Sequence, residues 1–578
     1  MIDRKNIDFI QILLSCLLFV LVTLVYRTGI EVPFQYDDIH SIKDNPNIRS
    51  LSNIPVFFQR ADMFTVDERS SMFRPVVLVT YALNYYIDGL QVDGYHWFNI
   101  CLHSLNSILL VFLGRRIGLC LPAAIFSAFL FAFHPINNET VNYVSSRSES
   151  LSALYMLCAL ISYMVLRSSA KLNLMLYGTS VVCFGLSLLS KSVGLMLIPV
   201  LFFYEWTFFG RKGIQSSCKL IVPYAVMGIC YIYKVRFMLE TSFFTAPIRS
   251  IEMQFSTQLK ALVQYVDWLF FPWPLSVEPG FTLGTSVTLH LLCMALLISF
   301  ASLWWKSNSI THFCLGWAVL SILPTILIPL NVLVNEHRLY VVTMAFSIAL
   351  CSILQQAQGK MLRKISIGGI IMLIIFARLD IARTKEWLDP RALWQAAQKV
   401  GPQMPRPYIF LGDLNRNEGH HELAIQNYGR ALVVQKKHLS GGDLFSIYSG
   451  IGGANLAQGE WSQAEQSYLA ALQVDPESES TKIALDAIYA FRLEDQRSKA
   501  KELLRDGLLA LVSGRVETAI KLLNQSVIIK PEARNLKALA KAYERAEKWE
   551  EADTVYQRIR MFIEENSMPG NSFENIFE

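Results

Sequence analysis

Two adjacent acids, Asp37 and Asp38, lie in the segment VPFQYDDIHSIKDNPNI, residues 32–48, just beyond an apolar run. A carboxylate can accept the proton of an incoming hydroxyl. Because two like charges held close favour sharing one proton, neighbouring acids can divide the work: one serves as base while the other orients an acceptor or a metal. The structural alternative is that these aspartates cap a helical turn or are simply solvated in a loop.

Further ionisable residues occur in short motifs at the ends of apolar runs. Arg74 lies in FRPV and Lys191 in LSKSVG. The motifs FAFHPINNETVNYVSSRSE and NVLVNEHRLY add His134, Glu139, Arg147, Glu336, His337 and Arg338. Each has a structural alternative: Arg147 can pair with Glu149, His134 can cap a helix end, and Lys191 can extend to the membrane interface.

Taken together, these groups predict a site for a lipid-linked phosphate. Ionisable groups at the edge of a membrane are costly unless they pair or serve a substrate. Arg and Lys can bind the phosphate of a lipid carrier and stabilise the charge that develops as it leaves. We assign the catalytic role to Asp37, Asp38 and Glu139, phosphate binding to Arg74, Arg147, Lys191 and Arg338, and other site roles to His134, Glu336 and His337.

The composition indicates that a membrane domain precedes a water-soluble one. The chain has 578 residues, of which 53% are hydrophobic and only 17% charged, which is too apolar for a soluble protein of this size. Residues 1–400 contain 53 charged residues, whereas the much shorter segment 401–578 contains 46. All ten cysteines lie in the apolar part without a CxxC pair, which argues against a disulfide framework or a zinc site.

Eleven apolar runs predict eleven membrane spans, the first of them retained rather than cleaved. They cover residues 8–28, 97–114, 118–133, 148–166, 173–189, 193–209, 219–237, 287–305, 311–330, 338–354 and 363–380. Alternate threading places thirteen basic residues on one side, and only Arg147, Lys191 and Arg338 in the short loops of the other. The basic side is therefore cytoplasmic. The acidic pair and the C-terminal region are expected on the opposite side. A surface helix is expected within residues 238–286, with a twelfth span as the alternative.

The C-terminal region repeats a pattern of small and aromatic residues. The first two stretches place Gly412, Gly419, Ala424, Tyr428 and Ala431 and then Gly452, Gly459, Ala464, Tyr468 and Ala471 at equal offsets. Two further stretches include Gly507, Gly514, Ala519, Ala540, Tyr543, Ala552 and Tyr556. Small residues let paired antiparallel helices approach closely, so this pattern resembles the tetratricopeptide repeat and predicts an α-solenoid.

In this order, the motifs resemble the TMTC (transmembrane and TPR-containing) O-mannosyltransferases. The resemblance rests on the acidic pair in the first outer loop, the RP step, HPI-x-x-E-x-V, SR-x-E, the lysine before the sixth span and NEHRLY, all ahead of the repeats. It implies an all-α chain with a GT-C-like membrane domain of about 11 spans. It also implies a polyprenyl-phosphate sugar donor, mannose as the sugar, Ser/Thr hydroxyls of proteins as acceptors, and inversion with Asp37 or Asp38 as the base.

The segment HPINNE keeps His134 and Glu139 of the family's HPIHTE but differs at Asn137 and Asn138. No metal ligand is assigned, and a divalent metal stays an alternative to having no cofactor. The expected partners are the donor, an acceptor protein held by the repeats, and membrane lipids, without nucleic acid. The small number of repeats favours a bacterial inner-membrane protein, with the endoplasmic reticulum membrane as the eukaryotic equivalent.

The expected organisation is a transmembrane domain at 1–385, a linker at 386–400, repeats at 401–565 and a tail at 566–578. Two alternatives to protein glycosylation stay open. The acceptor can be a glycolipid or polysaccharide, with the repeats as an assembly platform. A transporter or non-enzymatic scaffold is the other alternative, although transporters usually place charges near the bilayer midplane, and these spans are nearly free of internal charge.

Overall fold

In the computed structural model, the chain is described over residues 4–66, 72–169, 171–240, 251–281, 287–328, 332–434 and 439–566. The regular elements in these ranges are helices, and none of the ranges contains a strand. The prediction of an all-α membrane domain followed by repeats is therefore confirmed. The chain forms two compact units, residues 1–414 with 430–440, and residues 415–429 with 441–578. The boundaries expected at 385 and 400 stay predictions, and the expected tail lies outside the described residues beyond Asn566.

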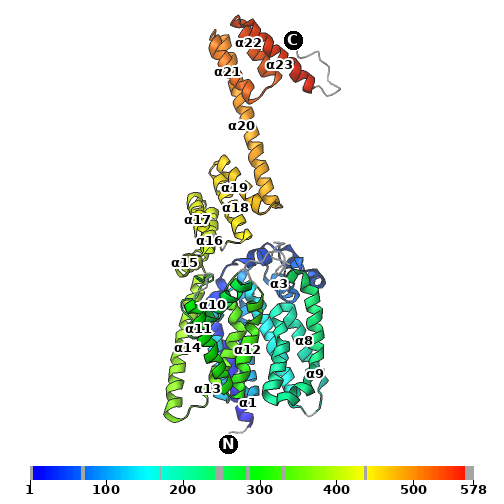
Figure 1. The fold of residues 1–578 in the computed structure, drawn as a ribbon, viewed down its shortest axis with the longest axis vertical. Coiled ribbons are helices and arrows are strands. Elements are labelled where there is room, and N and C mark those ends of the chain that lie inside the picture. The colour runs from blue at the N-terminus through cyan, green and yellow to red at the C-terminus, as the bar shows by residue number, and fades with distance from the viewer. Residues whose placement is uncertain are drawn as a thin grey trace. The chain divides into compact units, whose positions relative to one another are not determined.

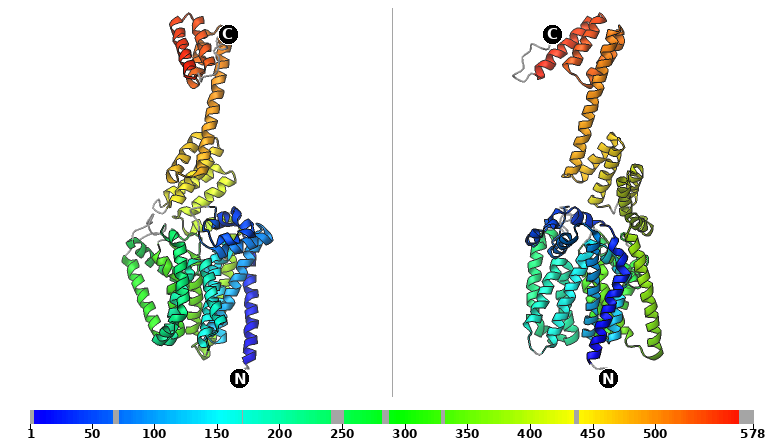
Figure 2. Two further views of the ribbon diagram at one scale, coloured as in Figure 1. Left: turned by 90° about the vertical axis from the view of Figure 1, so that its right-hand side faces the viewer. Right: turned by 180° about the vertical axis from the view of Figure 1, so that it is seen from behind.

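The first unit is built around a bundle of long apolar helices (Figures 1 and 2). They are α1 (Arg4–Tyr26), α4 (Val92–Ile117), α5 (Leu121–Ala132), α7 (Arg147–Ser168), α8 (Leu174–Ser190), α9 (Leu197–Glu240), α11 (Val287–Lys306), α12 (Ser309–Leu327), α13 (Tyr340–Leu354) and α14 (Gly359–Trp387). Among the described residues, seven helical stretches are long and apolar enough to cross a membrane, and three shorter ones are apolar. The protein is thus a multi-pass membrane protein.

Each of the eleven predicted apolar runs falls on one of these helices. Two of the runs share α9, which changes direction at Gly210, where φ is 63° and the backbone is not helical. A glycine has no Cβ to oppose that conformation. Local sequence signals set the ends of other helices: Asn173 and Asn308 accept hydrogen bonds from backbone N–H groups at the starts of α8 and α12, and Gly118 ends α4 in the left-handed conformation. The number of membrane crossings stays a prediction.

Short elements lie at the end of the bundle opposite the N-terminus (Figure 1). The loop between α1 and α4 contains a π-helical turn, Ile39–Lys43, and the helices α2 (Ile54–Phe57) and α3 (Pro75–Asp88). The connection from α5 to α7 contains α6 (Asn138–Asn142) between two 3-10 turns. The helix α10 (Ile251–Phe270) forms within the segment expected to lie along the membrane surface, and that placement stays a prediction.

The repeats consist of paired helices, as predicted. After α15 (Pro390–Val400), the chain forms α16 (Pro405–Asn417), α17 (His421–Val433), α18 (Gly441–Ala457), α19 (Trp461–Val474), α20 (Glu479–Val512), α21 (Val516–Ile529), α22 (Ala533–Arg545) and α23 (Trp549–Asn566). The small residues act as expected: a Cβ on Gly452 would lie 3.0 Å from the ring of Tyr468, and the side chain of Ala464 is fully buried.

The helix α20 explains why the interval between the second and third repeats is long. Its first half packs through Leu485 and Ile488 against Tyr468 of α19, while its second half carries Gly507, which approaches Leu523 of α21. Between these two contacts, residues 493–499 are all exposed. One 34-residue helix therefore closes the second repeat and also opens the third.

Candidate functional site

Asp38 anchors the turn that carries the acidic pair. It is only 1% exposed. Its carboxylate accepts hydrogen bonds from the backbone N–H and the hydroxyl of Ser145, at 2.8 and 2.5 Å, and from the backbone N–H of Gln35 at 3.2 Å. Burial raises the pKa of Asp38 to about 7, although these hydrogen bonds act in the opposite direction. The side chain thus ties the turn to the 3-10 turn Val144–Ser146.

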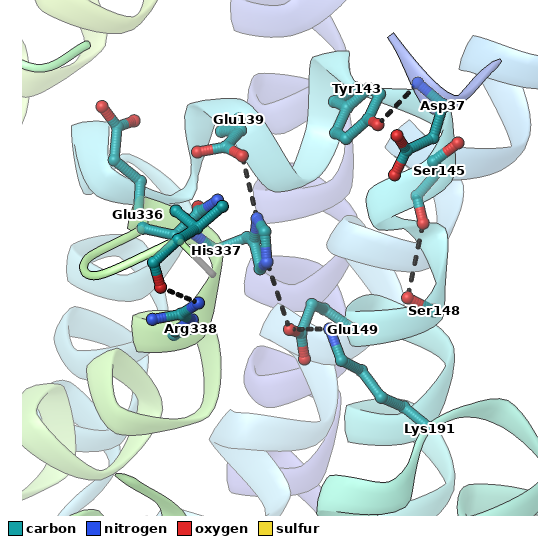
Figure 3. A network of polar contacts seen from close by, with 12 residues as sticks. Asp37, Glu139, Tyr143, Ser145, Ser148, Glu149, Lys191, Glu336, His337 and Arg338 are labelled. Carbon is teal, nitrogen blue, oxygen red and sulfur yellow. Dashed lines mark hydrogen bonds and ion pairs between the residues drawn. The ribbon is translucent and has the colours of Figure 1, made fainter. Parts of the chain in front are cut away.

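Asp37, in contrast, presents its carboxylate to solvent, with 55% of the side chain exposed. Its backbone N–H donates to the hydroxyl of Tyr143 at 3.1 Å (Figure 3), and its Oδ1 lies 3.3 Å from Nε2 of His40. Partial burial acts to raise the pKa of Asp37. Hydrogen bonds from His40 and Tyr143 and the charges of His40 and Arg74 outweigh it, so the pKa lies below its usual value. Asp37 is therefore the ionised and accessible member of the pair.

A second group of side chains is centred on His337, whose ring lies between two glutamates (Figure 3). The Nδ1 atom is 2.8 Å from Oε1 of Glu139, and Nε2 is 4.0 Å from Oε1 of Glu149. Burial raises the pKa of Glu139 to about 7, and the nearby charges of Arg383, Arg338 and Lys191 act against the rise. These residues come from α6, the first turn of α7 and the turn before α13, so the α5–α7 and α12–α13 connections meet here.

Cations join this second group. The ammonium of Lys191, which lies between α8 and α9, forms an ion pair with Oε1 of Glu149. Burial lowers the pKa of Lys191, the carboxylate of Glu149 raises it, and the charges of Arg74 and Arg338 lower it further. The guanidinium of Arg338 donates to the carbonyls of Val332 and Leu333 at 2.8 and 3.1 Å. The charges of Arg74 and Arg338 therefore both act on Lys191.

Arg74 connects the two groups. Its Nη1 donates to the hydroxyl of Ser148 at 3.3 Å, and that hydroxyl donates to the carbonyl of Ser145, the residue that binds Asp38 (Figure 3). The charge of Arg74 also lowers the pKa of both Asp37 and Lys191. The structure therefore links the acidic pair through Arg74 to the group that contains Lys191, Glu139, His337 and Arg338.

Three of the predicted site residues serve other parts of the structure. Arg147 is fully buried and donates to Asn99, Thr80, Asn84 and the carbonyl of Tyr95, at 2.7 to 3.1 Å. His134 is also fully buried: its Nδ1 accepts from the N–H of Ile136, and its Nε2 is 3.0 Å from the carbonyl oxygen of Leu269. Glu336 points away from His337 (Figure 3) and lies 3.5 Å from Nη2 of Arg383.

The sequence assignment omitted Glu149 and His40. The sequence offers Glu149 only as a partner of Arg147, whereas in the structure Glu149 forms an ion pair with Lys191 and faces His337. The SR-x-E motif indicates this, because Arg147 and Glu149 are two residues apart, and side chains at that spacing do not face each other on a helix. Glu149 therefore needs another partner. His40 follows Asp37 by three residues, the spacing that brings side chains together across one helical turn.

Metal binding is not supported by the side chains of this site. Within the part of the chain that the structure describes, no group of three or more His, Cys, Asp or Glu residues is arranged to hold a metal ion. His134 uses both ring nitrogens in contacts to the backbone.

The fold and the site define the class of protein. It is a multi-pass membrane protein that gathers acidic and cationic side chains at one end of its helix bundle and carries helical repeats after the bundle. Residues 72–251 match the family model described as dolichyl-phosphate-mannose-protein mannosyltransferase, and residues 536–560 match a tetratricopeptide repeat model. The chain is similar to protein O-mannosyl-transferase TMTC3 of Homo sapiens, with 23% identity over 88% of this chain and 60% of the relative. Tmtc3 of Drosophila melanogaster is 22% identical over 82% of this chain and 60% of the relative.

The resemblance to the TMTC proteins is thus confirmed, and the chain spans about 60% of the length of these curated relatives. Among solved structures, ArnT from Cupriavidus metallidurans bound to undecaprenyl phosphate aligns with a TM-score of 0.40 and 12% identity, over 81% of this chain and 80% of ArnT. The bacterial source stays a prediction.

Proposed function

We propose that this chain is a membrane glycosyltransferase that moves mannose from a polyprenyl-phosphate donor to Ser/Thr hydroxyls of proteins. One observation carries the proposal: Asp37, an exposed carboxylate whose pKa is held low, lies near the charge of Arg74, which also acts on Lys191. The family match over residues 72–251 and the names of the relatives supply the sugar and the acceptor class. On the distribution of basic residues, we place the site on the non-cytoplasmic side.

The chemistry follows from these positions. The acceptor hydroxyl gives its proton to the carboxylate of Asp37 as its oxygen attacks the anomeric carbon. The bond from that carbon to the donor's phosphate oxygen breaks, and the polyprenyl phosphate leaves with the electron pair. Because attack and departure occur on opposite faces, the anomeric configuration inverts. Arg74, Lys191 and Arg338 stabilise the charge that develops on the leaving phosphate.

The remaining members of the group hold these residues in place. Asp38 fixes the turn through Ser145 and is therefore a positioning residue. Glu149 orients Lys191, while Glu139 lies within hydrogen-bonding distance of His337 and fixes the orientation of its ring. The repeats would hold the acceptor chain near the site, since solenoids present extended binding surfaces.

The direct test is transfer by the purified full-length chain in lipid bilayers. Polyprenyl-phosphate mannose labelled in the sugar is supplied together with a Ser/Thr-rich acceptor protein. We expect the label to stay with the protein and to be released by alkali, as O-linked sugars are. Label recovered in the lipid extract instead would identify a glycolipid acceptor, and no transfer to either acceptor would contradict the proposal.

Replacing Arg74 should weaken donor binding. Hydrogen bonds to charged groups contribute about 1.5 to 3 kcal/mol, so Arg74→Gln should raise the donor KM about 10- to 100-fold. The measurement is initial rate against donor concentration. Arg60→Gln is the matched control, because Arg60 belongs to the same outer loop but pairs with Asp62 in an exposed position. An unchanged donor KM in Arg74→Gln would remove this residue from the phosphate site.

Replacing His40 should change the pH dependence of transfer. His40 lowers the pKa of Asp37, so Asp37 stays ionised to a lower pH than an ordinary aspartate. In His40→Ala that pKa rises, and the acid side of the profile of kcat against pH should move to higher pH. His40→Gln, which keeps a hydrogen-bond donor without a charge, should show a smaller displacement. A profile that does not move in either variant would show that the ionisation of Asp37 does not limit the reaction.

A further inference from the structure

The backbone just before the acidic pair is strained. Tyr36 has φ of 50°, in the left-handed region that residues other than glycine rarely adopt. Such conformations cost free energy and persist only where the surroundings enforce them. The turn around Tyr36 sets the direction of both carboxylates, because the N–H of Asp38 donates to the carbonyl of Gln35 and the N–H of Ile39 to that of Tyr36.

Two aromatic rings from far along the chain contact the ring of Tyr36. Its ring lies 4.6 Å from the ring of Trp394 and 4.9 Å from that of Phe410, measured between centroids. Trp394 and Phe410 are stacked on each other, with centroids 4.1 Å apart and planes inclined by 8°. Trp394 belongs to α15 and is 2% exposed, while Phe410 belongs to α16. We call these two rings the aromatic clamp.

The same segment holds the turn at a second point. The side chain of Gln35 donates to the carbonyl of Trp387 at 3.4 Å, and Tyr143 stacks on the Trp387 ring at 6.0 Å while its hydroxyl accepts the N–H of Asp37. Val32 is fully buried with Trp387 and Leu393. The turn is therefore fixed from one side by the α6–α7 connection and from the other by residues 387–410.

We infer that the aromatic clamp positions the acidic pair, so that Trp394 and Phe410 are positioning residues for the reaction although they lie after the last apolar helix. Without either ring, Tyr36 can relax to negative φ, which rotates the following peptides and draws Asp38 away from Ser145. A chain cut at residue 400 would lose Phe410, and with it part of the support of the site. The kinetic part of this inference rests on the proposed function, whereas the geometric part does not.

The test is carbodiimide labelling of carboxylates in the purified full chain, read by mass spectrometry. Trypsin releases residues 28–43 as one peptide, which contains Asp37, Asp38 and the exposed Glu31 as an internal reference. In the parent protein, Asp37 should label and Asp38 should be protected. In Trp394→Ala and Phe410→Ala, labelling of Asp38 relative to Glu31 should rise several-fold, while Trp394→Phe should retain the protection.

Two further variants separate the clamp from general loss of structure. Trp461→Ala removes a comparable stacked ring, 3.9 Å from Phe491 in the repeats, and should leave Asp38 protected. A glycine at position 36 adopts positive φ without strain, so the turn no longer depends on the aromatic clamp. Adding Trp394→Ala to Tyr36→Gly should therefore cause little further exposure of Asp38. Protection of Asp38 that is unchanged in both clamp alanine variants, or lost equally in Trp461→Ala, would overturn the inference.

Kinetics then distinguish this inference from the proposed function. If the parent transfers mannose, the clamp alanine variants should lose kcat while keeping the donor KM, because the phosphate-binding cations are untouched. A raised donor KM at unchanged kcat would contradict a role in positioning the acids. If the parent shows no transfer, the proposed function fails, and the labelling pattern alone decides whether the clamp holds the turn.

Discussion

Asp37→Asn should reduce sugar transfer by about 10²- to 10⁴-fold, the range over which a positioned general base contributes to a rate. The amide keeps the size of the side chain but cannot take the proton of the acceptor hydroxyl. Donor binding should be nearly unchanged, because Arg74 and Lys191 keep their partners Ser148 and Glu149. The measurement is single-turnover transfer from polyprenyl-phosphate mannose, which isolates chemistry from product release.

Asp38→Asn is the matched control for this prediction. Its oxygen can still accept from Ser145, but its NH₂ group would face the N–H of Gln35, which is also a donor. We expect a looser turn and a smaller loss of rate than in Asp37→Asn. The reverse order, with Asp38→Asn nearly inactive and Asp37→Asn active, would assign the base to Asp38.

Arg147→Met should destabilise the membrane domain severely instead of weakening donor binding. The substitution leaves the oxygens of Asn99, Thr80 and Asn84 and the carbonyl of Tyr95 without their donor. Each buried polar group left unpaired costs about 1 to 3 kcal/mol, so the total loss should reach several kcal/mol. The guanidinium also lies over the rings of Tyr81 and Phe98, at 5.0 and 4.5 Å, and those contacts are lost as well.

Thermal unfolding in detergent measures this effect, and Arg74→Met provides the comparison. Arg74 is only half-buried and donates a single hydrogen bond, to Ser148, among the described residues, so its replacement should lower the unfolding temperature far less. Arg147→Lys should fall between the two, because a lysine keeps the charge but cannot reach all four acceptors. Normal stability in Arg147→Met, combined with a raised donor KM, would return Arg147 to the phosphate site.

The helices and repeats could be predicted because each depends on local patterns. Apolar runs mark the membrane helices, and the offsets from Gly452 to Ala464 and Tyr468 mark a helix pair by size alone. The end of the bundle at which the site lies could also be predicted, since helices that alternate in direction bring every second connection to the same side. Asp37, Lys191 and His337 lie in such connections.

The roles within the site could not be predicted in the same way. Asp37 and Asp38 are identical in type and adjacent, and only the packing of Ser145 against the turn makes one of them buried and the other accessible. The sequence alone assigns both Arg147 and Lys191 to phosphate binding. What separates them is the polar surroundings of Arg147, supplied by α3 and α4 from elsewhere in the chain. Long-range contacts of this kind leave no signal in one sequence.

The exposed middle of α20 has a consequence for how the repeats unfold. In a solenoid, neighbouring repeats are coupled through the surfaces that they bury against each other. Leu493 and the six residues after it bury nothing, so the cluster around Tyr468 and Leu485 and the cluster around Leu523 and Leu539 share no apolar interface. The two ends of the solenoid should therefore melt as separate cooperative blocks in calorimetry, and a destabilising substitution in one block should leave the other intact.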